Sequence, residues 1–186
     1  MATITIAPYS HEVYHNVTKP SLYEAIQGFR SSNAMQYINT VIRDCFLKHN
    51  LQKQFTACIN HRHFDISPNE RNIEEDDGSA FGSADLDGII PCTWLFHEGK
   101  LYPYEFKRGA EEESNEPPLE FVNELGTILE KHGLCDVIGL QAYTDGIVGM
   151  EKTDHERNVS TTRSFPEGAP ELQDPRNAVV ASFAFF

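Results

Sequence analysis

Residues 89–107 read IIPCTWLFHEGKLYPYEFK, and the prediction of the fold starts from this stretch. Two apolar runs, 89–96 and 101–107, are each long enough for a β-strand. The four residues between them, His97-Glu98-Gly99-Lys100, are typical of a β-hairpin turn. A hairpin by itself is marginally stable in water, so further strands and a covering layer must lie elsewhere in the chain.

Helices are expected on both sides of this hairpin. Ser21 and Glu24 form a capping box, and the residues that follow place apolar side chains on one helical face. A second helix is expected from residue 34 to Asn50, with its apolar face made by Ala34, Met35, Ile38, Val41, Ile42, Cys45 and Phe46. A third helix is expected with Pro117-Pro118 in its first turn and Gly133 as its C-terminal cap.

Further strands are expected from runs of apolar or alternating residues, at 3–6, 55–66, 136–143, 158–165 and 179–186. Residues 67–85 and 109–116 are expected to be acidic surface loops, and 166–177 a loop before the C-terminal strand. The pattern predicts a single domain over residues 1–186. Its fold class is α+β, with an antiparallel or mixed sheet of about five to seven strands covered by helices.

The composition of the chain limits its expected binding partners and its expected location in the cell. The chain has 186 residues and a formal net charge of -13, and residues 65–116 hold 14 acids against 4 bases. Such a charge disfavours nucleic acid and anionic membranes as partners, and leaves a small ligand or a protein partner. The four widely spaced cysteines have no CxxC pair, and the first residues lack a secretory signal, so a cytoplasmic location is expected.

The first candidate site consists of Asp87, Glu105 and Lys107. Asp87 precedes the first strand of the hairpin, and Glu105 and Lys107 share one face of the second by the two-residue period. With the helices around it, this order resembles the core of the PD-(D/E)xK nucleases. The resemblance implies a phosphodiester hydrolase in which Asp87 and Glu105 hold a divalent cation such as magnesium. Glu105 and Lys107 would act in catalysis, with Lys107 orienting the attacking water, and Gln141 is a weaker addition.

The alternative for these residues is structural. Glu105 and Lys107 would then form ordinary surface ion pairs on an exposed face of the hairpin.

The second candidate site is His61-Arg62-His63. Two histidines at alternate positions of an expected strand project to one side, and Asp65 follows on that side. Two histidines and a carboxylate suit a transition metal. The alternative is a pair of half-buried histidines hydrogen-bonded across the sheet, with Arg62 facing solvent. If the strands are sequential in the sheet, His61, His63 and Glu105 line one polar face and the two candidate sites are one.

Three short segments also carry a resemblance: HRHF at 61–64, Pro-x-x-Trp at 91–94 and PYEF at 103–106. Together they resemble segments of a group of uncharacterised fungal proteins. This resemblance implies a fungal intracellular origin and supplies no activity.

Two functions therefore follow from the sequence. The first is the metal-dependent hydrolase. The second is a non-catalytic protein that binds a small ligand, a metal or a protein partner through the sheet face of His61 and His63. Tyr102 and Tyr104 are candidates for lining a ligand pocket, on the strand face opposite to Glu105 and Lys107.

Overall fold

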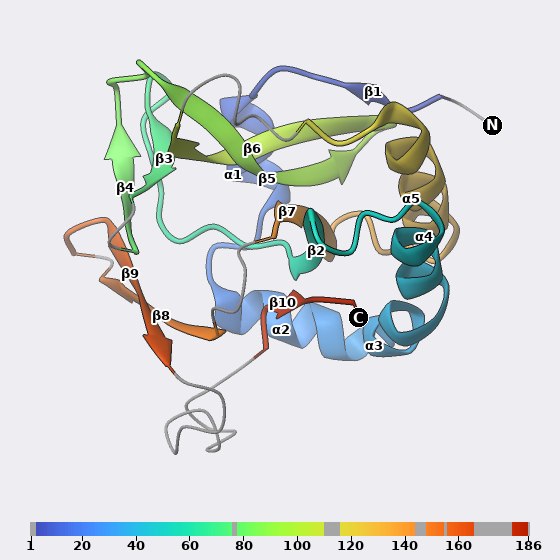
Figure 1. Cartoon of the computed structure of the whole chain (residues 1–186). Coiled ribbons are helices and arrows are strands. Elements are labelled where there is room, and N and C mark those ends of the chain that lie inside the picture. Colours follow the sequence, from blue (N-terminus) through green and yellow to red (C-terminus); the bar gives the residue numbers. More distant parts are fainter. Residues whose placement is uncertain are drawn as a thin grey trace.

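The computed structural model describes residues 3–75, 78–109, 116–143, 148–154, 156–165 and 180–185. Within these ranges ten strands form one sheet in the order β10-β2-β7-β5-β6-β3-β4-β9-β8, and β1 pairs with β6 (Figure 1). The strands are β1 (Thr5–Ile6), β2 (Phe55–Ile59), β3 (Arg71–Glu74), β4 (Ser79–Ser83), β5 (Ile89–His97), β6 (Lys100–Arg108), β7 (Ile138–Ala142), β8 (Val148–Asp154), β9 (Val159–Phe165) and β10 (Ser182–Phe183).

The helices are α1 (His11–Val17), α2 (Leu22–Ser31), α3 (Ala34–Tyr37), the π-helical segment η1 (Ile38–Ile42), α4 (Arg43–Lys48) and α5 (Leu119–Lys131). The predicted combination of helices with a mixed sheet is confirmed, because β1 and β3 run parallel to β6 whereas the other pairs are antiparallel. No helix in the described ranges is long and apolar enough to cross a membrane.

The hairpin of β5 and β6 forms as predicted (Figure 1). Its two turn residues, Glu98 and Gly99, both have positive φ, at 47° and 71°. This is the conformation of a type I′ turn, whose twist matches that of the flanking strands. The turn type therefore holds the register in which His97 faces Lys100.

The predicted sheet of five to seven strands is too small. Part of the error lies in residues 67–85, which were expected to be loop but contain β3 and β4. β3 offers only Ile73 as a buried apolar side chain in a polar surrounding, a pattern too short to predict a strand. It becomes a strand because β6 supplies a hydrogen-bonding edge on which Ile73 pairs with Phe106. The strand β8 also enlarges the sheet, whereas β1 corresponds to the short strand expected at 3–6.

The helix expected from residue 34 onward is interrupted by the π-helical η1. The wider turn brings every fourth side chain into line, so Ala34, Ile38, Ile42 and Phe46 are buried. The expected apolar face also contained Met35 and Val41, and this part was wrong, since they are 44% and 38% exposed.

Two apolar cores lie on the sheet. The larger one packs α2, α3, η1, α4 and α5 against β2, β7 and β5, with Trp94 and Phe121 among its buried side chains. The smaller one joins Tyr14 of α1 to Leu95 and Tyr104, beneath Phe64 and Ile66. The smaller core is the one that borders the candidate site.

The C-terminal residues pair as expected within the described range 180–185. β10 is antiparallel to β2, and Phe185 is buried in the larger core. The expected loop at 166–177 and most of the loop at 109–116 lie outside the described residues.

Candidate functional site

A buried cluster of polar side chains brings the two candidate sites together. Nε2 of His63 lies 2.9 Å from Oε1 of Glu105, and the rings of His61 and His63 are 5.0 Å apart, edge to face. The side chains of His63 and Glu105 are only 12% and 13% exposed. The structure therefore places His61, His63 and Glu105 in one cluster, although the sheet order that it shows is not sequential.

The histidines reach Glu105 by a route that the sequence did not predict. The strand expected at 55–66 ends at Ile59, so His61 and His63 belong to an irregular segment, residues 60–66, that follows β2. Nδ1 of His61 lies 2.9 Å from the carbonyl oxygen of Ile59. This segment carries Phe64 into the smaller core and His63 to Glu105.

A β-bulge positions Glu105. Trp94 pairs with Pro103 and Thr93 pairs with Glu105, which leaves Tyr104 as the extra residue of β6. Bulges redirect side chains, and they are also the place where a sheet tolerates proline. Strict alternation, expected for residues 101–107, therefore does not hold at Tyr104. Tyr104 joins the core of Phe64 while its neighbour Glu105 meets His63.

Glu105 is held as a carboxylate. Burial by itself would raise its pKa, but the charge and hydrogen bond of His63, the charge of His61 and a hydrogen bond from Thr93 outweigh burial, so the pKa lies below its ordinary value. A buried carboxylate is costly unless it is paired and hydrogen-bonded. The site meets this condition with partners from three separate segments.

Asn72 of β3 completes the cluster and is 2% exposed. Its Nδ2 donates to Oε1 of Glu105 across 3.2 Å. Within the described part of the chain, its Oδ1 has no hydrogen-bond partner. Since buried polar atoms in proteins are nearly always hydrogen-bonded, this oxygen is a buried acceptor whose hydrogen-bonding capacity is unused among the described residues.

The cluster belongs to a row of polar residues across the sheet. Five polar residues occupy successive paired positions on the neighbouring strands β2, β7, β5, β6 and β3. They are Thr56, Gln141, Thr93, Glu105 and Asn72. Gln141 was the weaker candidate of the first site, and its Oε1 accepts a hydrogen bond of 2.7 Å from Ser182. Sequence reasoning missed Asn72, because it lay in an expected loop, and Thr93, because a lone threonine in an apolar run carries no signal.

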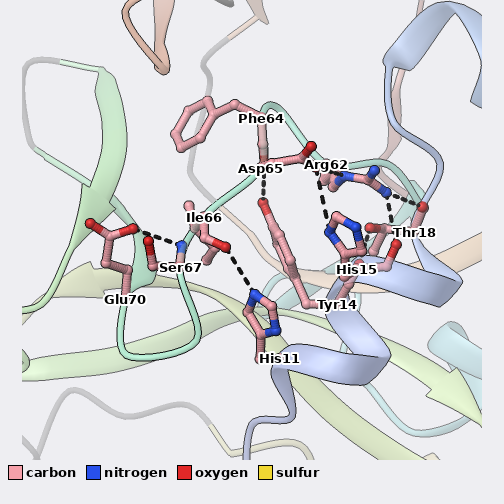
Figure 2. Close-up of polar contacts among 10 residues, drawn as sticks. All are labelled: His11, Tyr14, His15, Thr18, Arg62, Phe64, Asp65, Ile66, Ser67 and Glu70. Carbon is pink, nitrogen blue, oxygen red and sulfur yellow. Dashed lines mark hydrogen bonds and ion pairs between the residues drawn. The ribbon is translucent and has the colours of Figure 1, made fainter.

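Arg62 anchors the segment that carries the histidines, as Figure 2 shows. Its Nη1 donates to the carbonyl oxygens of His15 and Thr18, at 3.0 and 2.9 Å, and its Nε donates to Asp65 at 2.7 Å. The alternative that placed Arg62 on a solvent face was wrong, since its side chain is 10% exposed. Asp65 pairs with Arg62 and, at 3.5 Å, with His15, so it is engaged with residues other than His61 and His63.

Two other contacts hold the same segment on α1. The hydroxyl of Tyr14 donates to the carbonyl oxygen of Phe64 across 2.8 Å, and the ring of His11 lies 2.8 Å from the carbonyl oxygen of Ile66 (Figure 2). Because the carbonyl groups of an irregular segment have no strand partner, these side chains from α1 satisfy them. They fix the backbone on both sides of His63.

Asp87 lies at the open end of the hairpin and is exposed. Its carbonyl oxygen accepts a hydrogen bond from Arg108, the last residue of β6, which pairs with Ile89. Glu105 pairs with Thr93, which lies further along β5. Arg108 is three positions beyond Glu105, roughly 10 Å along a strand. Lys107 lies two residues after Glu105 and faces Glu74 of β3. The structure therefore keeps Lys107 near Glu105 and places Asp87 at a different end of the strand pair.

Tyr102 and Tyr104 pack in or against the smaller core. Burial, with the charge of Glu105 as the next cause, raises the pKa of Tyr104 well above its ordinary value. Its hydroxyl therefore stays protonated beside the cluster.

Comparison with protein-family models, with curated proteins and with solved structures finds no match to this chain. A proposal for the function of this chain therefore rests on the geometry of the site.

Proposed function

We propose that this protein binds a small ligand rich in hydrogen-bond donors, such as an amine or a guanidinium compound, at the cluster of Glu105, Asn72 and His63. The observation that carries the proposal is the free Oδ1 of buried Asn72 beside a buried carboxylate. Two acceptors side by side favour a ligand that donates.

The charge of the sequence segment that includes the site supports a cationic ligand. Residues 65–116, which include Asn72 and Glu105, carry ten more acids than bases, with 14 against 4. A local excess of one sign attracts ligands of the opposite sign and raises their rate of association. The bulge at Tyr104 and the anchored segment 60–66 hold the acceptors in place before the ligand arrives, which lowers the entropic cost of binding.

A titration with spermidine and with agmatine, followed by calorimetry, tests the proposal. We expect binding of at least one probe, weakened at least tenfold by Glu105→Gln and by Asn72→Leu. Glu124→Gln is the matched control, because Glu124 is also a carboxylate with a lowered pKa but lies on α5. Circular dichroism establishes that each variant is folded. Absence of binding to both probes, or equal binding by wild type and Glu105→Gln, contradicts the proposal.

Magnesium-dependent phosphodiester hydrolysis is the second candidate. It is favoured by the register of β3 and β6, which sets Glu74 opposite Lys107 and Asn72 opposite Glu105. Glu74 would then replace Asp87 as the second carboxylate ligand of the cation. Hydrolysis of bis(p-nitrophenyl) phosphate that requires magnesium and is lost in both Glu105→Gln and Lys107→Met would establish this function in place of the first. A lack of turnover would exclude it.

A further inference from the structure

A second cluster, apart from the site above, joins α4 to α5. Its members are Cys45 of α4, His49 at the C-terminal cap of α4 and Glu124 of α5. One potential ligand atom from each, a sulfur, a ring nitrogen and a carboxylate oxygen, lies within 4.8 Å of the other two. Figure 1 shows the two helices side by side.

Local geometry explains why these side chains meet. Cys45 and His49 are four residues apart, and on a helix such residues lie on one face. The ring of His49 also packs edge-on against Phe121, one turn before Glu124 on α5, at 5.6 Å between centroids. That contact orients the imidazole, whose Nε2 lies 2.8 Å from Oε2 of Glu124. The sequence signal was therefore the spacing Cys-x-x-x-His at residues 45–49, which sequence reasoning missed.

Two nitrogen atoms, from Lys48 and His49, contact Glu124 in this arrangement. Nζ of Lys48 lies 2.6 Å from Oε2 of Glu124, the same oxygen that His49 contacts. The hydrogen bond from Lys48, followed by that from His49, lowers the pKa of Glu124. Burial and then the charge of Glu124 raise the pKa of Cys45 to about 12, so the thiol is protonated.

We propose that Cys45, His49 and Glu124 form a binding site for zinc. The set of sulfur, nitrogen and oxygen donors suits a borderline-soft ion and is unsuited to magnesium or calcium, which prefer oxygen alone. Three protein ligands leave the fourth position of a tetrahedral ion to water. Zinc displaces the proton of the Cys45 thiol, which goes to solvent, and it displaces Lys48 from Glu124.

The pair of His49 and Glu124 needs only a small adjustment to bind an ion. Bonds of about 2.0 Å to nitrogen and oxygen in a tetrahedral site set those two atoms about 3.3 Å apart. His49 and Glu124 are 2.8 Å apart, so they separate by roughly half an ångström. Glu124 is 33% exposed while Cys45 is buried, so the ion enters from the side of Glu124.

Metal titration of the whole chain tests this inference. With cobalt as a probe, we expect one equivalent bound with the absorption of a thiolate-to-cobalt charge transfer, and zinc should displace it. Cys45→Ala should abolish that absorption and weaken zinc binding at least tenfold, and His49→Gln should weaken zinc binding to a similar degree. Cys135→Ser is the matched control, because Cys135 is also a free cysteine but lies outside the cluster.

Lys48→Met gives a second, independent readout. Lys48 is exposed and competes for Glu124, so its removal should tighten zinc binding severalfold without changing the fold. Binding that persists in Cys45→Ala, is lost in Cys135→Ser, or is unaffected by Lys48→Met would overturn the inference, as would an absence of stoichiometric binding. None of these results depends on the ligand proposed for Glu105.

Discussion

Nε2 of His63 and Oε1 of Glu105 lie 2.9 Å apart in the interior of the protein, and both side chains are almost fully covered. One comes from an irregular segment after β2 and the other from the bulged position of β6. A buried pair of this kind stabilises the folded state only while both side chains are present. Removing one of them leaves the other buried without this hydrogen bond, which lowers stability. Its effect on stability is therefore open to measurement.

Replacement of Glu105 by leucine should lower the free energy of unfolding at pH 7 by about 3 kcal/mol, since His63 and Asn72 then lose their shared acceptor. Denaturation in urea, followed by circular dichroism, measures this change. The control is Glu98→Leu, at an exposed turn position, which should change stability by less than about 0.5 kcal/mol. Equal effects of the two substitutions would contradict the role given to Glu105.

The same residue should leave a signature in the dependence of stability on pH. The pKa of Glu105 is lowered by folding, so its contribution is fully present above the ordinary value of 4.5. That contribution is lost as the pH falls through the lower pKa of the folded state. The difference in unfolding free energy between wild type and Glu105→Gln should therefore shrink as the pH is reduced below 4.5. A difference that is constant from pH 7 to pH 3 would show that Glu105 does not titrate in this way.

Arg62 should be needed for stability in a way that lysine cannot replace. Its guanidinium bonds two carbonyl oxygens of the segment around α1 and the carboxylate of Asp65 at once. We expect Arg62→Ala to cost about 2–3 kcal/mol and Arg62→Lys to recover less than half of that, because an ammonium lacks the fork of donors. Chemical denaturation provides the measurement. Arg43→Ala, which removes an exposed pair with Asp44, should be nearly neutral.

Two glycines offer a matched test of packing. A Cβ at Gly139 in β7 would lie against the side chain of Asn60 and 2.6 Å from the carbonyl oxygen of Trp94, which is backbone and cannot turn away. Gly139→Ala should therefore lower the melting temperature, at a cost of about 1–3 kcal/mol. At Gly28 in α2 nothing lies within 4 Å of the added carbon. Gly28→Ala should raise stability by up to about 1 kcal/mol, because alanine favours a helix. Effects of the same sign at both positions would refute the close approach at Gly139.

The sequence predicted those elements whose residues carry their own local signal. Ser21 caps α2 as its capping box indicates, and Glu98-Gly99 closes the hairpin. The apolar stripe after Pro118 became α5. In each case the decisive contacts join residues a few positions apart, so spacing along the chain is enough to reveal them.

Three features escaped prediction because their causes are not local. β3 is a strand only because its backbone forms hydrogen bonds with the edge of β6. The segment 60–66 leaves the extended path at Asn60 because side chains of α1 bind its backbone and Arg62 binds the backbone of α1. Cys45 and Glu124 meet only because α4 and α5 pack together.

The sequence by itself therefore determined the helices that are amphipathic, the hairpin, and the kinds of side chain available for chemistry. Only the tertiary structure decided which of those side chains meet. It brings Glu105 to His63 and Asn72 and places Asp87 away from Glu105. The physical reason is that a bulge or a crossing segment shifts a side chain by one position, and the period along a strand contains no information about where such a shift occurs.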